Sequence, residues 1–195
     1  LGTVTAAGIP IYPELNVTFF AADNTRIIYL SNPVGIQLNT PVDPAAVLQG
    51  GVNASVVPAR SGVATFVNIS VSKTGNYSLR VVVFGTAFSA STGLFTIAPG
   101  AFRRIAISAI NNGTGGLPLP TQPQCTLLDA FGNLITGTGT ATCLPVALSF
   151  SSPDVTSFLL SGNTTAAFVN GQAVFSGITI DAAGTYVLNC TVQQL

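Results

Sequence analysis

The chain has 195 residues with six basic and six acidic side chains, so its formal net charge is zero. Charged residues make up 6% of the chain, against about 25% in an average soluble domain. This balance offers no electrostatic field to recruit nucleic acid or an anionic membrane surface, and no apolar run approaches the roughly 20 residues that a membrane-spanning helix requires. Histidine is absent, which removes the usual general base near neutral pH and the commonest metal ligand.

The first predicted element is an N-terminal arm at 1–13, LGTVTAAGIPIYP. Its first six residues alternate with a period of two, which indicates an extended strand. Two interpretations of the arm stay open. It is either the first strand of its own domain, or a donor strand that inserts into the second domain of a neighbouring subunit.

A repeat organises the rest of the chain. Residues 61–81, SGVATFVNISVSKTGNYSLRV, align without a gap with residues 170–190, NGQAVFSGITIDAAGTYVLNC, at an offset of 109. The matches include Phe66 with Phe175 and Tyr77 with Tyr186. Each copy shows apolar residues with a period of two, and turn signals recur every 8–12 residues, which together predict short antiparallel strands. We therefore expect an all-β chain of two domains, 1–98 including the arm and 99–195.

LLDAFGN at 127–133, followed by the second copy of the repeat, resembles the immunoglobulin-like repeats of large extracellular surface and adhesion proteins. In those repeats a D-x-x-G-N turn follows strand B, and the segment ending in AGTY-x-L spans strands E and F. The resemblance implies two tandem immunoglobulin-like antiparallel β-sandwich domains. Asp23 and Asp129 match across the repeats, and we expect each to form an Asx turn. The chain lacks the strand C Trp of antibody domains, which argues against antigen-receptor membership.

Cys125 and Cys190 have the strand parity of core residues, and their positions resemble the disulfide that joins strands B and F in immunoglobulin domains. The alternative is two buried free thiols. The third cysteine, Cys143, is either free or paired with another chain. No C-x-x-C spacing accompanies these residues, so we expect no metal site.

Seven of the thirteen asparagines lie in N-glycosylation sequons, where a Ser/Thr frequency near one in five predicts about two or three by chance. Strand parity predicts that several of them face solvent. Glycans would supply the hydration that the few charges do not, while the alternative is coincidence in a Ser/Thr-rich β protein. The candidate sites are Asn16, Asn53, Asn68, Asn76, Asn112, Asn163 and Asn189.

Residues 84–99 supply a closing strand for the first domain, whereas the second repeat stops four residues after Thr191 without a last strand. A sandwich without that strand exposes a sheet edge and part of its core. One interpretation is that a neighbouring subunit donates the strand, which would propagate a filament. The other is that the sequence is a fragment and the strand follows residue 195.

These observations predict a structural subunit of an extracellular, N-glycosylated fibril or surface appendage that assembles head to tail with copies of itself. The alternative is a stalk or binding module of a cell-surface adhesin, which an exposed aromatic cluster in the loops would favour; most aromatic residues here are predicted to lie in strands and the core. No nucleophile–base pair is recognisable, so we expect no enzyme, no catalytic residue, no cofactor beyond covalent N-glycans and no small-molecule substrate.

Overall fold

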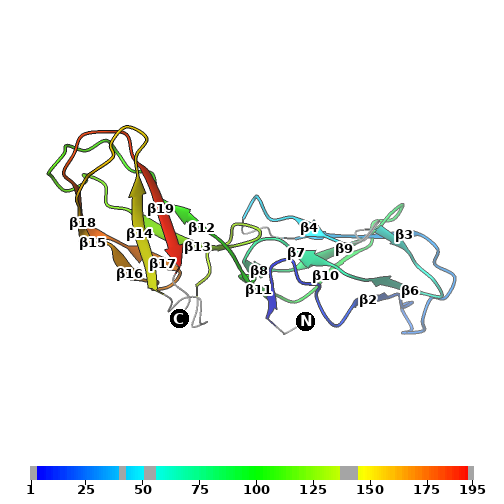
Figure 1. Ribbon diagram of the computed structural model, residues 1–195. Coiled ribbons are helices and arrows are strands. Elements are labelled where there is room, and N and C mark those ends of the chain that lie inside the picture. Colours follow the sequence, from blue (N-terminus) through cyan, green and yellow to red (C-terminus); the bar gives the residue numbers. More distant parts are fainter. Residues whose placement is uncertain (1–3, 40–42, 51–55, 137–144, 193–195) are drawn as a thin grey trace. The chain divides into compact units, whose positions relative to one another are not determined.

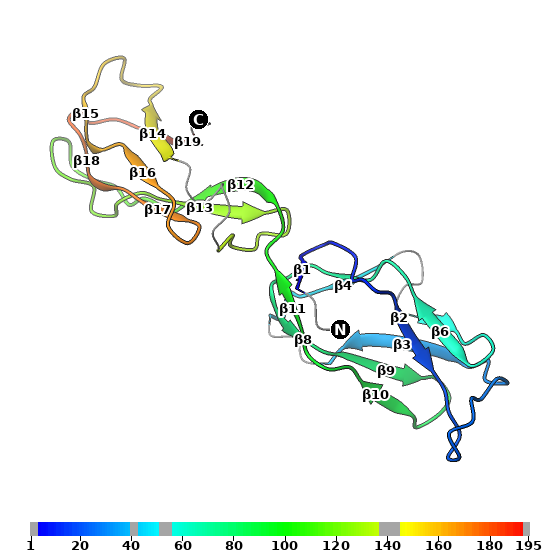
Figure 2. The ribbon, with the colours of Figure 1, turned by 90° about the horizontal axis from the view of Figure 1, so that it is seen from below.

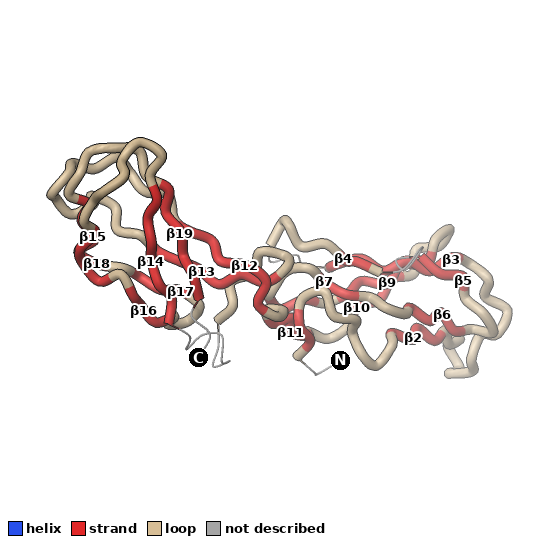
Figure 3. Tube along the Cα trace, viewed as in Figure 1, coloured by secondary structure: helices blue, strands red, loops and turns tan. Residues whose placement is uncertain are grey.

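The computed structural model describes residues 4–39, 43–50, 56–136 and 145–192 of the chain. Within these residues every regular element is a β-strand, and no helix occurs (Figure 3). The chain divides into two compact units, which we call unit 1, Leu1–Gly100, and unit 2, Ala101–Leu195 (Figure 1). Each unit is an immunoglobulin-like β-sandwich, as the sequence predicts.

The strands of unit 1 are shown in Figure 2, and its described residues form eleven of them. One sheet has the order β10-β9-β3-β5, a second has the order β1-β11-β8, and β2-β6 and β4-β7 form separate pairs. All pairings are antiparallel except β1 with β11. The strands are β1 (Thr5–Ala6), β2 (Leu15–Thr18), β3 (Pro33–Leu38), β4 (Leu48–Gln49), β5 (Val56–Pro58), β6 (Val63–Phe66), β7 (Ser70–Val71), β8 (Gly75–Tyr77), β9 (Leu79–Val83), β10 (Ser89–Ser91) and β11 (Phe95–Ala98).

Unit 2 repeats the central part of this arrangement with antiparallel pairs only. Its sheets have the orders β12-β13-β17 and β16-β14-β19, with β15-β18 as a separate pair. The strands are β12 (Phe102–Ile107), β13 (Gln124–Asp129), β14 (Pro145–Ser151), β15 (Leu160–Asn163), β16 (Thr165–Ala167), β17 (Gln172–Val174), β18 (Ser176–Ile180) and β19 (Val187–Val192).

Each unit packs its own core from alternate strand residues, because successive side chains of a strand point to opposite faces. The core of unit 1 includes Val34, Ala64 and Phe66, and that of unit 2 includes Cys125, Val146 and Phe175. Since β13 and β19 belong to different sheets of unit 2, residues 125 and 190 face each other across the sandwich interior.

The tight turn that precedes β6 in unit 1 has the same conformation as the turn that precedes β17 in unit 2. Ser61-Gly62 and Asn170-Gly171 have positive φ at both residues, the geometry of a type I′ hairpin turn. A Cβ on Gly62 would clash with the carbonyl oxygen of Ile27, and one on Gly171 with that of Ile135. Glycine is therefore required at these two positions for close backbone approach as well as for conformation.

The predicted Asx turns are present at both matched aspartates. Asp129, which is fully buried, accepts hydrogen bonds from the backbone N–H groups of Phe131 at 2.8 Å and Asn133 at 2.9 Å. Its other oxygen accepts from the Asn133 side-chain amide at 2.8 Å. Asp23 accepts from the Thr25 N–H at 2.9 Å and from the Thr25 hydroxyl at 2.6 Å.

The N-terminal arm belongs to unit 1 from Thr5 onward. Thr5–Ala6 pair with Ile97 and Ala98 of β11, and the Ala7 N–H donates to the Ala98 carbonyl at 2.8 Å. Ile11 is buried, with its N–H bonded to the Ile69 carbonyl at 2.7 Å. Of the two interpretations of the arm, the structure has the one in which it is a strand of its own domain.

Candidate functional site

The sequon asparagines within the described residues all carry exposed side chains: Asn16, Asn68, Asn76, Asn112, Asn163 and Asn189. The seventh candidate, Asn53, lies outside the described residues, as does Cys143. An exposed side-chain nitrogen is the requirement for an attached glycan, because the sugar must project into solvent. The geometry of the six described sequons is therefore compatible with N-glycosylation.

Four of these asparagines stand directly opposite a Ser or Thr on the neighbouring strand: Asn16 opposite Thr65, Asn76 opposite Thr96, Asn163 opposite Ser176 and Asn189 opposite Ser149. The Thr65 hydroxyl donates to the Asn16 Oδ1 at 2.7 Å, and Thr96 does the same to Asn76 at 2.7 Å. Both bonds engage the amide oxygen, so the nitrogen that would carry the glycan faces away from the bond.

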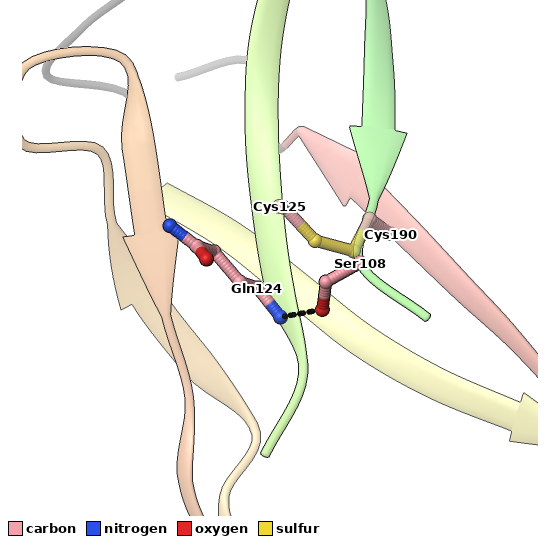
Figure 4. Close-up of a disulfide and its surroundings, with 4 residues drawn as sticks. All are labelled: Ser108, Gln124, Cys125 and Cys190. Carbon is pink, nitrogen blue, oxygen red and sulfur yellow. Dashed lines mark hydrogen bonds between the residues drawn. A yellow bond between two sulfur atoms is a disulfide. The ribbon is translucent and has the colours of Figure 1, made fainter. Parts of the chain in front are cut away.

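Cys125 and Cys190 form a disulfide that joins β13 of one sheet to β19 of the other (Figure 4). Cys125 is fully buried and Cys190 half-buried. Beside the disulfide, the Gln124 N–H donates to the Ser108 hydroxyl at 3.0 Å, which extends the pairing of β12 with β13 (Figure 4). The disulfide therefore links β19 covalently to β13 of the opposite sheet across the core of unit 2.

The matched strands of the two units differ in burial on one side of the sandwich only. Ala64, Phe66 and Ile69 in unit 1 are buried, and so are their matches in unit 2, Ala173, Phe175 and Ile178. Along the next strand the units diverge. Tyr77, Leu79, Val81 and Val83 are at most 6% exposed, whereas their matches in unit 2, Tyr186, Leu188, Cys190 and Val192, are only half-buried.

The burial differs because covering strands pair with β8 and β9 in unit 1, whereas the matching segment of unit 2 has no such strand among the described residues. In unit 1, β9 has a partner strand on each side, β3 and β10, and the preceding β8 is paired with β11. In unit 2, β19 pairs with β14, and no other strand of the described part of the chain pairs with it. Residues 184–186, which match β8, lie outside any strand, and no described strand pairs with them. We call the unpaired side of β19 the open edge.

A cavity of about 510 Å³ lies in unit 2 beside the open edge. Apolar side chains from both sheets line it together with uncharged polar ones, among them the sequon Asn112, and its lining contains no Asp, Glu, Lys or Arg. Loop residues 110–115 close one side. The apolar members of the lining include Ile107, Leu119, Phe150, Ile180, Tyr186 and Leu188.

A second surface, which the sequence reasoning missed, lies on the loops of unit 1 between β2 and β3 and between β9 and β10. The two loops meet at the same end of the unit, where the Asn32 side chain donates to the Phe84 carbonyl at 3.0 Å (Figure 2). They carry Phe20, Tyr29 and Phe88 at 59%, 88% and 75% exposure. We call these two loops the loop end.

Most aromatic side chains are buried or partly buried, as the sequence predicts, but those of the loop end are exceptions. The sequence holds a local indication of this exposure, because Phe20 and Tyr29 flank the Asp23-Asn24 turn and Phe88 follows the Gly85 turn. Aromatic side chains next to turn residues fall outside the period of two that marks a buried strand face.

Two ionisable groups of unit 1 have shifted pKa values. The Thr25 hydroxyl and N–H, which donate to the Asp23 carboxylate, hold the pKa of Asp23 below its usual value. Burial raises the pKa of Tyr77, and the negative charge of Asp43 raises it further. Within the described residues no group of three or more His, Cys, Asp and Glu could hold a metal ion, and no helix is long and apolar enough to cross a membrane.

No protein-family model matches the chain. No curated protein matches it either. Among solved structures, the chain is similar to the "D0-D1 domain of Intimin" at 15% sequence identity, with 98% of this chain and 88% of that chain covered and a TM-score of 0.32. A TM-score of 0.32 is too low for this similarity to bear on the function of the chain.

Proposed function

We propose that the chain is a non-catalytic structural subunit of an extracellular, N-glycosylated fibril or surface appendage that assembles with copies of itself. The observation that carries the proposal is the exposed apolar surface of both units on a chain with 6% charged residues, where large apolar side chains such as Ile9, Tyr29 and Leu117 are more than half exposed. Exposed apolar surface of this kind marks contacts with other protein chains.

The environment follows from two further features. A disulfide that spans the core persists in oxidising compartments, which favours an extracellular location. Six exposed sequon asparagines on a chain with 6% charged residues favour a glycan coat as the source of hydration.

Electron microscopy and sedimentation of the glycosylated chain test this proposal. We expect filaments in negative stain and a sedimentation coefficient that increases with protein concentration. A chain that remains monomeric and dispersed throughout the concentration series would contradict the assembly.

A second candidate function is supported by the loop end. Exposed aromatic side chains on two adjoining loops suit a binding surface, because they offer large contact area at low entropic cost. In this reading the chain is the stalk or binding module of a cell-surface adhesin. The test is binding of the chain to cells or glycan arrays, with Tyr29→Ala and Phe88→Ala as variants and Val174→Ala, an exposed residue of unit 2, as the matched control.

A further inference from the structure

One exposed aromatic side chain of unit 1 lies away from the loop end and beside a sequon. The N-terminal arm runs antiparallel past Ile69, where the Ile11 N–H donates to the Ile69 carbonyl at 2.7 Å, and β2 then pairs antiparallel with β6 in a register shifted by one residue. In an antiparallel arrangement, residues joined by such a bond stand opposite each other, and the residue after one faces the residue before the other. That next pair is Tyr12 and Asn68.

Both members of this pair face solvent. Ile11 and Ile69 are 7% and 3% exposed, so their side chains point into unit 1. Successive side chains of an extended segment point to opposite sides, and Tyr12 is accordingly 78% exposed, while the Asn68 side chain is also exposed. The Tyr12 ring and the Asn68 amide therefore lie on the same outer surface, within the reach of a long aromatic side chain across a strand pair.

The environment of this sequon differs from that of the four sequons that stand opposite a Ser or Thr. A threonine hydroxyl bonds the amide oxygen of Asn16 and of Asn76 from the neighbouring strand. Asn68 instead lies at a bend with a φ of 55°, a left-handed conformation that Asn adopts more readily than most residues. Among the described sequons with an opposite residue, Asn68 is the one that faces an aromatic ring.

The surface around the pair has the chemistry of a sugar-binding platform. Pro13 is exposed and Val67 is 44% exposed, and Glu14 is the single charged side chain within residues 8–15 and 66–71. A pyranose ring presents a face of weakly positive C–H groups, which suits the negative face of an aromatic ring. The sugar hydroxyls point outward from this contact and remain hydrated.

From this juxtaposition we infer that Tyr12 is a docking platform for an N-glycan attached to Asn68, with the sugar nearest the asparagine stacked on the phenol ring. The occupant is the glycan of the chain itself, because covalent attachment at the opposite residue gives that sugar an effective concentration that a free ligand lacks. The inference rests on the proposed N-glycosylation. It gives one glycan a role beyond hydration, since the sugar belongs to the bend after β6 and the ring belongs to the arm, so that stacking fastens the arm to unit 1.

A double-mutant cycle on the secreted, glycosylated chain tests the platform, after glycopeptide mass spectrometry has measured the occupancy of Asn68. Tyr12→Ala should lower the melting temperature by about 3 °C in the chain that carries this glycan, and by less than about 1 °C in the Asn68→Gln background. Tyr12→Phe keeps the aromatic face and loses only the hydroxyl, so it should unfold at the temperature of the unaltered chain.

A second way of removing the glycan guards against a backbone effect. Asn68→Gln places another residue at a positive φ and carries a cost of its own. Ser70→Ala removes the same sequon and keeps Asn68, and the cycle subtracts the individual cost of either substitution. Both routes should give the same coupling with Tyr12. Asn163→Gln in unit 2 is the matched control, and its effect should not depend on Tyr12.

Enzymatic trimming locates the contact within the glycan. An endoglycosidase that leaves one sugar on each asparagine should preserve the coupling, because the stacked sugar is the one retained. Nuclear Overhauser contacts between the Tyr12 ring protons and the C–H protons of that sugar should then be observed. An occupied Asn68 without such contacts, or with effects that simply add to those of Tyr12, would overturn the platform.

Failure of the platform and failure of the proposed function give different results. Additive effects at an occupied Asn68, or an empty Asn68 in a chain that is glycosylated elsewhere, would exclude the platform alone and leave the glycosylated subunit standing. A secreted chain without a glycan at any sequon would exclude the platform together with the proposed glycan coat.

Discussion

Asp129 and Asp23 occupy the same place in the repeat and form the same Asx turn, but they differ in burial. Asp129 is fully buried and accepts three hydrogen bonds, while Asp23 is exposed. Removing a buried acceptor leaves its donors unsatisfied, which costs more than the bond itself contributes. We expect Asp129→Ala to lower the free energy of unfolding by about 3 kcal/mol. Urea denaturation measures the loss, and Asp23→Ala, the matched control, should show a much smaller one.

At the same scale, the pKa of Asp23 reports on its turn. Since the folded-state pKa is depressed, the turn contributes stability above the unfolded value near 3.8, and that contribution is lost as the pH falls through the folded pKa. Thr25→Val removes the hydroxyl, the larger cause of the shift, so the pKa of Asp23 should rise toward 3.8. A carboxyl titration by NMR that is identical in the variant would contradict this assignment.

At the scale of elements, the matched strands β9 and β19 give a direct comparison. Leu79 is 1% exposed under its covering strands, whereas Leu188 is half-buried at the open edge. Leu79→Ala should therefore cost about 3 kcal/mol and Leu188→Ala about half as much in the monomer, because the cost follows the apolar surface and cavity lost. Denaturant unfolding of the two variants measures the difference. Equal costs would mean that the open edge is covered in the monomer.

The disulfide between β13 and β19 closes a separation of 65 residues, for which the chain-entropy model gives about 4 kcal/mol. Unit 1 provides the apolar replacement, since Val17 and Val81 stand at the matching positions. The double variant Cys125→Val, Cys190→Val should fold and lose about this amount in chemical denaturation. A loss below about 1 kcal/mol would show that the packed core, with valine in place of the disulfide, restrains the unfolded chain equally well.

The elements that the sequence predicts well are those that the repeat marks twice. The Ser61-Gly62 turn and its match fix two hairpins, and the alternation around Tyr77 and Tyr186 fixes the strands that follow. Burial along those strands could not be predicted in the same way. It depends on whether another strand covers the edge, which is a property of tertiary pairing and not of the strand itself. The loop end was missed for a related reason, because exposure of Tyr29 is decided by how its loop leaves the sheet.

For the whole molecule, charged side chains are few, so we expect N-glycans to supply much of the hydration of the surface. The described sequon asparagines are all exposed and occur in both units, and many large apolar side chains are exposed as well. Enzymatic removal of N-glycans under native conditions should therefore lower the solubility of the chain and raise its light scattering, while its thermal unfolding changes little.

The control for deglycosylation is a chain in which one sequon is removed at a time by Asn→Gln, beginning with Asn16 and Asn76. If glycans act as a general hydration shell, solubility should fall gradually with the number of sites removed and should not depend on which site is lost. Loss of assembly from a single site, Asn189 on β19, would instead mean that the glycan there takes part in a contact between copies of the chain. Mass spectrometry of the intact glycoprotein, which counts occupied sites, must accompany both measurements, and an unoccupied chain that stays soluble would contradict the role given to the sequons.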